Sequence, residues 1–104
     1  MSDLEMDTHF VNGVKIQTWK TTISSANIIE VEAGTNGYHG GDTGHGGRTY
    51  IRIADQGGTD MEAKIPNDGR GVEICLGGDT ELGTMIEALE FILNILKIQT
   101  STSA

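Results

Sequence analysis

Two kinds of periodicity divide the chain into a strand-forming part and a helical C-terminal part. Short segments up to Leu76 alternate apolar and polar residues, which is typical of half-buried strands. From Leu82 onward the apolar residues recur every three or four positions, which is helical spacing. We therefore predict an α+β fold with five or six mostly antiparallel strands and one long C-terminal helix.

Two tight turns define the expected strand pairs. Asn12–Gly13 separates two apolar runs, and this dipeptide favours the positive φ angles of a hairpin turn. Pro66–Gly69 combines a proline that presets φ with an Asp-Gly pair, so it predicts a second hairpin between 61–65 and 72–76. The remaining strands are expected at 27–33 and 48–54, the latter with Tyr50 and Arg52 on one face and Thr49, Ile51 and Ile53 on the other.

The helix is expected to run from about Thr80 to about Ile98, followed by a frayed tail at 100–104. Asp79 or Thr80 could cap it, and Thr84 with Glu87 has the spacing of a capping box. The apolar stripe is wider than one sheet face can cover, so we expect a partner helix from a second copy. The interface positions expected from this argument are Leu89, Ile92, Leu93 and Leu96.

Length and charge restrict the class of protein. At 104 residues the chain is expected to form a single domain, 1–104, with its sheet within 8–76. The net charge is −8 and only seven residues are Lys or Arg, which argues against long nucleic acids and anionic membrane surfaces as partners. A small anionic ligand is still compatible, because a few local donors outweigh a distant net charge.

The N-terminus and the single cysteine favour a cytoplasmic protein. Met1–Asp7 is acidic and polar, unlike a signal peptide, and the apolar stretch 91–96 is too short to span a bilayer. Cys75 is the only cysteine, and its place in an apolar alternating segment predicts a buried, inert thiol. Glu30 and Glu32 share one strand face and are expected to be solvated, and Trp19 is expected in the core or an interface.

The richest candidate for binding chemistry is the glycine-rich segment 34–47 with the strand that follows it. Glycines let backbone N–H groups converge on an anion, Arg48 offers a forked charge, and tyrosines can stack on a base. This inventory suits a small phosphorylated ligand, and no cofactor is expected. The candidate ligand-binding residues are Asn36, Tyr38, His39, Thr43, His45, Arg48, Tyr50 and Arg52.

Two other interpretations of this segment remain open. It could be an ordinary long loop in which glycine serves only the turns. It could also bind a metal ion, because His39, Asp42 and His45 lie three positions apart, although a glycine-rich chain does not hold them on one helical face. We expect no metal and assign no catalytic residue, since no nucleophile motif is present in the sequence.

Two stretches of the chain resemble known small proteins. The first runs from Glu32–Tyr38 through Gly47–Ile53 and the second is Leu76–Leu82, and both are similar to sequences in small orphan proteins of Firmicutes phages and prophages. In layout, a small antiparallel sheet with a C-terminal helix, the chain resembles the Thoeris anti-defence type of nucleotide-sequestering protein. The resemblance implies an oligomer in the host cytoplasm that binds cyclic ADP-ribose-like or cyclic dinucleotide immune signals without cleaving them. The resemblance does not assign a role to any individual pocket residue.

The sequence therefore favours a non-enzymatic anti-defence protein that sequesters a small phosphorylated ligand, with a cyclic nucleotide as the first candidate. The first alternative is a metal-dependent enzyme that uses His39, Asp42 and His45. The second is a protein–protein interaction module that acts through its apolar helix.

Overall fold

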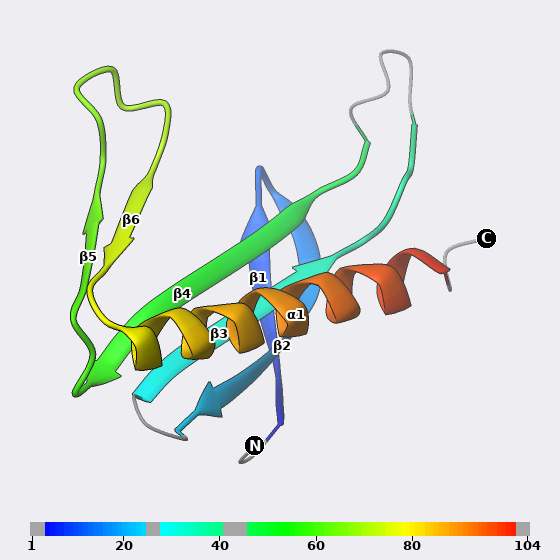
Figure 1. Cartoon of the computed structure of the whole chain (residues 1–104). Helices are drawn as coiled ribbons and strands as arrows, with labels where there is room; N and C mark the ends of the chain where they lie inside the picture. The colour runs from blue at the N-terminus through cyan, green and yellow to red at the C-terminus, as the bar shows by residue number, and fades with distance from the viewer. Residues whose placement is uncertain (1–3, 25–27, 41–45, 102–104) are drawn as a thin grey trace.

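The computed structural model describes residues 4–24, 28–40 and 46–101, and it contains six strands and one helix (Figure 1). A four-stranded antiparallel sheet has the order β1-β2-β3-β4, and a separate hairpin pairs β5 with β6. This arrangement confirms the expected α+β class. The elements are β1 (Glu5–Val11), β2 (Val14–Ile23), β3 (Ile28–Thr35), β4 (Thr49–Gly57), β5 (Met61–Lys64), β6 (Glu73–Leu76) and α1 (Asp79–Ser101).

Both predicted hairpin turns are present. Asn12 and Gly13 have φ angles of 50° and 81°, so the dipeptide supplies the two positive values of a tight turn. In the second turn Gly69 N–H donates to the Pro66 carbonyl at 2.9 Å, and Gly69 has a φ of 67°. The first hairpin extends beyond the apolar residues next to its turn. The acidic segment that begins at Glu5 also pairs with β2, and the last pair is Glu5 with Lys20.

The core lies between α1 and one face of the four-stranded sheet. Strand β3 is central and flanked on both sides, so Val31 and Ala33 on its helix-facing side are fully buried. Apolar residues of the helix at helical spacing pack against them, as the sequence predicts. The buried residues of this core are Ile23, Val31, Ala33, Met85, Ala88, Ile92 and Ile95, with Trp19, Ile53, Met61, Leu76, Phe91 and Leu96 packed around them.

On the opposite face the sheet curls, so that its own edge strands cover the middle of this face. The edge strands β1 and β4 approach each other across this face, and His9 stacks on Tyr50 with 4.0 Å between ring centroids. Gly34 lies beneath, where an added Cβ would sit 2.3 Å from the Gln17 carbonyl oxygen. The curl buries Glu32 to 2% exposure, so the expectation of a solvated Glu32 was wrong. A sheet face that no helix covers is exposed to solvent only where the sheet stays flat, and here the curl shields Glu32 from solvent.

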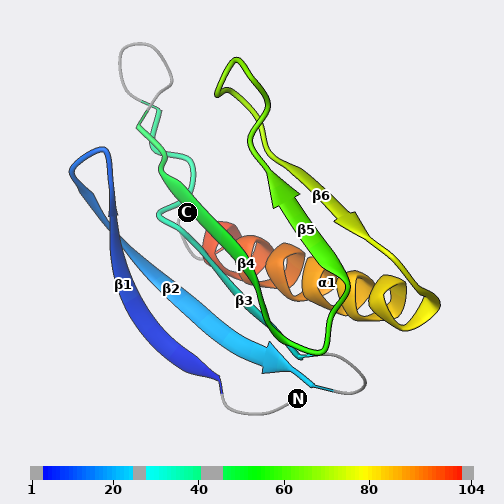
Figure 2. The ribbon, with the colours of Figure 1, turned by 90° about the vertical axis from the view of Figure 1, so that its left-hand side faces the viewer.

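The β5–β6 hairpin lies beside the four-stranded sheet as a separate ribbon (Figure 2). Met61 and Leu76, at its base, contact the core. Further along, Ile65, Val72 and Ile74 are exposed. Cys75 is exposed too, which corrects the expectation of a buried thiol. The alternating pattern correctly indicated a strand, but the described residues include no covering layer for the hairpin at that position.

The helix begins at Asp79, one residue before the expected start, and ends at Ser101, so Thr100 and Ser101 are helical and not part of a frayed tail as expected. Thr84 lies inside the helix and donates to the Thr80 carbonyl at 3.0 Å, so the capping-box interpretation of Thr84 and Glu87 was wrong. The buried Glu81 accepts a hydrogen bond of 3.3 Å from the Asp60 N–H, which ties the helix start to the chain entering β5. Within the described residues, no helix meets the length and apolarity needed to cross a membrane.

Candidate functional site

A pocket of about 460 Å³ lies between the glycine-rich segment and the C-terminal end of α1. The chain before and after residues 41–45 forms one wall, and the last turns of the helix form the other. The sequence singled out the first wall but not the second. The pocket is lined by Thr35, Gly37, Tyr38, His39, Gly40, Gly47, Thr49, Leu96 and Thr100.

Hydrogen bonds close the base of the glycine-rich segment. Asn36 N–H donates to the Arg48 carbonyl at 3.1 Å, and Arg48 N–H donates to Asn36 Oδ1 at 2.6 Å. The Thr35 hydroxyl donates to the same Arg48 carbonyl at 2.9 Å and lies 3.0 Å from the Thr49 hydroxyl. Since these bonds extend the β3–β4 ladder beyond its last strand pair, the two arms of the segment leave the sheet from a fixed position.

Two glycines allow the arms to run close together above this base. Gly37 has a φ of 88°, a value that favours glycine, and its N–H donates to the Thr35 hydroxyl at 3.1 Å. A Cβ on Gly47 would lie 2.6 Å from the Gly37 carbonyl oxygen. These glycines therefore serve a close approach of the two backbone arms.

The helical wall is fixed to the sheet by Gln99. Its Oε1 accepts a hydrogen bond of 2.8 Å from the Thr35 N–H, and its Nε2 donates to the Gln17 carbonyl at 3.0 Å. One side chain thus binds the backbones of β2 and β3. Leu96 and Thr100, the two helical residues that line the pocket, flank this anchor in the sequence.

The predicted site residues separate into groups. Tyr38 and His39 line the pocket, and Tyr38 is 88% exposed, so one of its ring faces is available for stacking. Asn36 supports the base of the segment, and its carbonyl accepts a hydrogen bond from the His39 ring. Thr43 and His45 lie outside the described residues, as does Asp42 of the alternative metal site.

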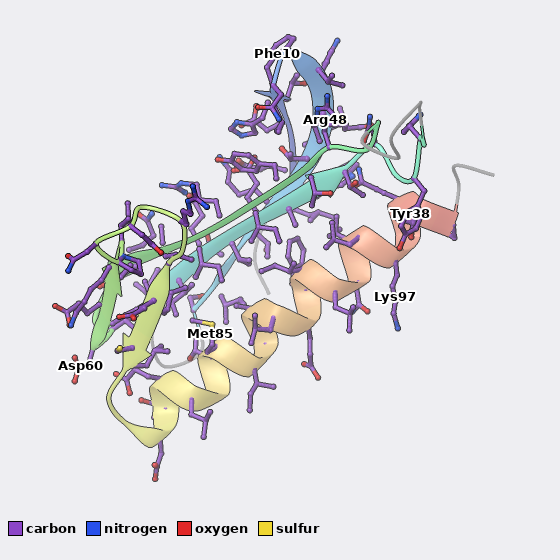
Figure 3. The ribbon with its side chains drawn as sticks, turned by 90° about the horizontal axis from the view of Figure 1, so that it is seen from above. Phe10, Tyr38, Arg48, Asp60, Met85 and Lys97 are labelled. Carbon is purple, nitrogen blue, oxygen red and sulfur yellow. The ribbon has the colours of Figure 1, made fainter. Side chains whose placement is uncertain are left out.

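The predicted cationic and aromatic residues of the following strand lie toward the other face. Figure 3 shows Tyr38 over the end of α1, whereas Arg48 lies on the side of β1 and β2. The Arg48 guanidinium donates to the carbonyl of Gly47, a pocket residue, at 3.0 Å. Arg52 pairs with Glu30, and Tyr50 stacks on His9. Arg48 therefore does not line the pocket but is joined to it through the backbone of Gly47, and Tyr50 and Arg52 lie away from the pocket.

Burial raises the pKa of Tyr50 above its usual value, and the carboxylate of Glu32 raises it further. Asp7 acts in the same direction, while Arg52 and Lys20 oppose the shift. Tyr50 is therefore a neutral phenol at physiological pH, and it belongs to the cluster on the curled face rather than to the pocket.

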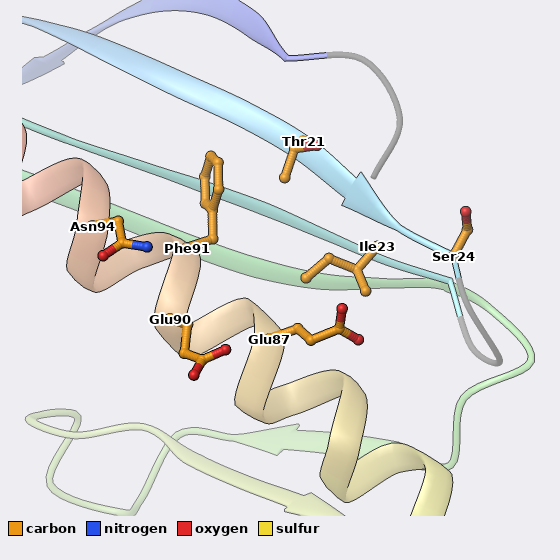
Figure 4. Close-up of a pocket in the computed structure, with 7 residues that line it drawn as sticks. All are labelled: Thr21, Ile23, Ser24, Glu87, Glu90, Phe91 and Asn94. Atoms are coloured by element: carbon orange, nitrogen blue, oxygen red, sulfur yellow. The ribbon is translucent and has the colours of Figure 1, made fainter.

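A second pocket, of about 400 Å³, lies between β2 and the middle of α1 (Figure 4). Glu87 and Glu90 line it together with Asn94, and Phe91 and Ile23 supply apolar surface. The two carboxylates make this pocket unfavourable for a phosphorylated ligand. Of the two, the pocket at the glycine-rich segment is therefore the candidate site.

Sequence reasoning missed Leu96 and Thr100. Both lie in the helix, about sixty positions after Thr35 of the glycine-rich wall. Only the packing of α1 on the sheet brings these two residues to the pocket, so no local pattern could have identified them. Comparison with models of protein families, with curated proteins and with solved structures finds no match to this chain.

Proposed function

We propose that this protein binds and sequesters a small phosphorylated ligand, a cyclic nucleotide in the first place, in the pocket at the glycine-rich segment. The observation that supports this proposal most directly is the composition of the pocket. It combines an exposed aromatic ring, an imidazole, threonine hydroxyls and three glycines, and its volume of about 460 Å³ is in the range of small-molecule sites.

Each part of a nucleotide has a candidate contact. Tyr38 can stack on a base, and glycine backbone on both arms can approach a phosphate closely. Among the lining residues that the structure describes, none is Lys or Arg. Arg48, whose guanidinium donates to the Gly47 carbonyl, is the positively charged residue nearest in sequence to the glycine-rich wall of the pocket. We assign it the contact with the phosphate because it follows Gly47, a pocket residue, in the chain.

Sequestration rather than turnover fits the lining of this pocket. Thr35 and Thr49 are the hydroxyls at the base of the glycine-rich wall, and Thr35 donates to a backbone carbonyl instead of to a base. The imidazole of His39 is hydrogen-bonded to the Asn36 carbonyl. A sponge releases its ligand intact when the protein is denatured by heat, whereas a metal-dependent enzyme that uses the segment releases an altered product. Mass spectrometry of the released material separates the two.

We further propose that the protein acts as a homo-oligomer through α1. Ile92 of the expected interface is buried against the sheet and Leu96 is partly buried there, so neither is the main contact. Leu89 and Leu93 remain about half exposed, and they continue a stripe begun by Leu82 and Ile86. The spacing of four, three and four residues is that of a coiled-coil seam.

The stripe is complementary to itself in an antiparallel pair of helices. A two-fold axis at its midpoint sets Leu82 opposite Leu93 of a second copy and Ile86 opposite Leu89. Asp79 and Lys97 are 18 positions apart, or about five turns of 3.6 residues, so they lie on the same side of the helix. The same register brings Lys97 close to Asp79 of the second copy at both ends of the pair. This charge match favours a second copy of the chain over an unrelated host protein.

The β5–β6 hairpin supports the same proposal. A two-stranded hairpin is marginally stable in water unless something packs against it. Here Ile65, Val72 and Ile74 are exposed, and the hairpin is joined to the start of α1, beside Leu82. A second copy docked at the start of the helix stripe would lie next to the base of the hairpin, and we propose that it covers Ile74 there.

A further inference from the structure

Three potential metal ligands converge on the curled face of the sheet, away from the pocket. Asp7 and His9 come from β1, and Glu32 comes from β3. His9 Nε2 donates a hydrogen bond of 2.7 Å to Glu32 Oε2 and lies 3.7 Å from Asp7 Oδ2. One ligand atom from each residue lies within 4.8 Å of the other two.

Two neighbouring residues, Thr18 and Tyr50, orient these potential ligands. The Thr18 hydroxyl donates to Glu32 Oε2 at 2.6 Å, in the buried part of the sheet. The ring of Tyr50 stacks on the His9 imidazole at an interplanar angle of 12°, which fixes the plane of the ring. Metal-binding carboxylates and imidazoles are commonly oriented by such secondary contacts.

We propose that Asp7, His9 and Glu32 form a binding site for a divalent transition-metal ion, with zinc as the best fit. Zinc accepts imidazole nitrogen and carboxylate oxygen at about 2.0–2.2 Å, so tetrahedral ligand atoms lie about 3.4 Å apart. The observed separations of 2.7 and 3.7 Å lie on either side of that value. Each of these two separations would have to change by less than about 1 Å to reach the spacing that a tetrahedral zinc ion sets.

The local charge also favours a cation. Two carboxylates face one imidazole, and Glu32 is almost completely buried, so its charge is poorly solvated. A divalent ion would neutralise both carboxylates while His9 binds as the neutral imidazole. Asp7 is exposed, so the fourth coordination position would open to solvent, as in sites that keep a water or a substrate. This site goes beyond the proposed function and does not depend on it.

The direct test is titration of the metal-free protein with Zn²⁺ by calorimetry and with Co²⁺ by visible absorption. We expect one equivalent to bind, with the intense cobalt bands of a four-coordinate site and a higher melting temperature. His9→Gln should abolish binding. Thr18→Val, which removes only the hydrogen bond to the ligand oxygen, should weaken it by about tenfold or more.

Asp7→Asn is a second ligand variant, and His39→Gln is the matched control. Asp7 lies on an exposed edge strand, so Asp7→Asn tests the ligand role at a position that tolerates substitution, and it should weaken binding. His39 lies in the pocket, so His39→Gln should leave metal binding unchanged. Absence of zinc and cobalt binding would overturn the proposal and leave His9–Glu32 as an ion pair only. Loss of binding in His39→Gln would overturn it too.

Discussion

The imidazole of His9 lies against the ring of Tyr50, with 4.0 Å between the centroids and 12° between the planes. These residues belong to β1 and β4, the two edges of the sheet, so the contact shows that the sheet curls until its edges meet. Gly34 on β3 pairs with Tyr50, and its lack of a side chain permits the close approach of β3 to Gln17 and Thr18 of β2. The curl in turn buries Glu32, and Tyr50 lies in this cluster and not in the pocket at the glycine-rich segment.

Gly34→Ala should destabilise the protein. The new Cβ would lie 2.3 Å from the Gln17 carbonyl oxygen and 2.8 Å from Thr18 Cα, and backbone atoms cannot rotate away as a side chain can. Overpacking of this kind costs about 1–3 kcal/mol or more of unfolding free energy. Urea unfolding followed by circular dichroism measures the loss.

The matched control is Gly83→Ala in α1. A Cβ added at Gly83 would meet no atom of the described residues within 4 Å apart from its own stretch of helix. The residue is helical and exposed, so alanine should stabilise the protein by about 1 kcal/mol. Equal effects of the two substitutions would contradict the role assigned to Gly34.

Tyr50 should make the folded state less stable at alkaline pH. Its folded pKa is raised above the usual value of 10.0 by burial and by Glu32, so the unfolded state loses the phenolic proton first. The unfolding free energy should be unaffected by this group below pH 10.0 and should fall as the pH rises toward the folded pKa. Tyr50→Phe should show a shallower fall in urea unfolding across that range. Identical slopes would argue against the buried environment of the phenol.

Gln99 should stabilise the contact between α1 and the sheet. Gln99→Ala removes hydrogen bonds to the Thr35 N–H and the Gln17 carbonyl, at a cost of about 1–3 kcal/mol if the backbone groups stay unsatisfied. Gln99→Glu keeps the acceptor and loses the donor, so its cost should be smaller. Hydrogen exchange of the Thr35 amide provides a local measurement: protection should fall in the alanine variant and persist in the glutamate variant.

Much of the fold could be predicted because its signals are local. Asn12–Gly13 and Pro66–Gly69 specify their turns by φ alone, and the change of apolar period after Leu76 marks the helix within a residue or two of its observed start. The face of each strand also followed from alternation, since Tyr50 pairs across from Gly34 and Arg52 from Glu32 on one face.

The remaining features depend on tertiary packing and could not be predicted in this way. Glu32 is buried because of the curl, and Cys75 is exposed on a hairpin that the described residues leave uncovered. The candidate site was half predicted: the glycine-rich wall has a composition signal, whereas Leu96 and Thr100 reach the pocket only through helix packing. Alternation placed Tyr50 and Arg52 on one face, but it did not indicate that Glu30 pairs with Arg52.

Self-association should depend on the exposed stripe of α1. Leu89→Glu with Leu93→Glu should lower the mass measured by multi-angle light scattering, because both side chains are exposed and the core should survive. Far-UV circular dichroism checks that α1 remains folded. A wild-type monomer at micromolar concentration would contradict the proposal.

The antiparallel register has its own test in the pair Asp79 and Lys97. Lys97→Asp alone and Asp79→Lys alone should each weaken the oligomer, because each places like charges together at both ends of the helix pair. The combined Asp79→Lys, Lys97→Asp variant should recover association. Failure of the double variant to recover would exclude this register while leaving the stripe itself open to another one.

The central claim, that the pocket binds a small phosphorylated ligand, is tested most directly by calorimetry with a panel of cyclic nucleotides. We expect one member of the panel to bind wild-type protein, with affinity reduced about tenfold or more in Arg48→Ala because a charged hydrogen bond is worth about 1.5–3 kcal/mol. Tyr38→Ala should also weaken binding through the lost stacking. Arg52→Ala should not, since Arg52 pairs with Glu30 on the other face. Binding that is unchanged in Arg48→Ala and Tyr38→Ala, or the absence of any binding across the panel, would contradict the account.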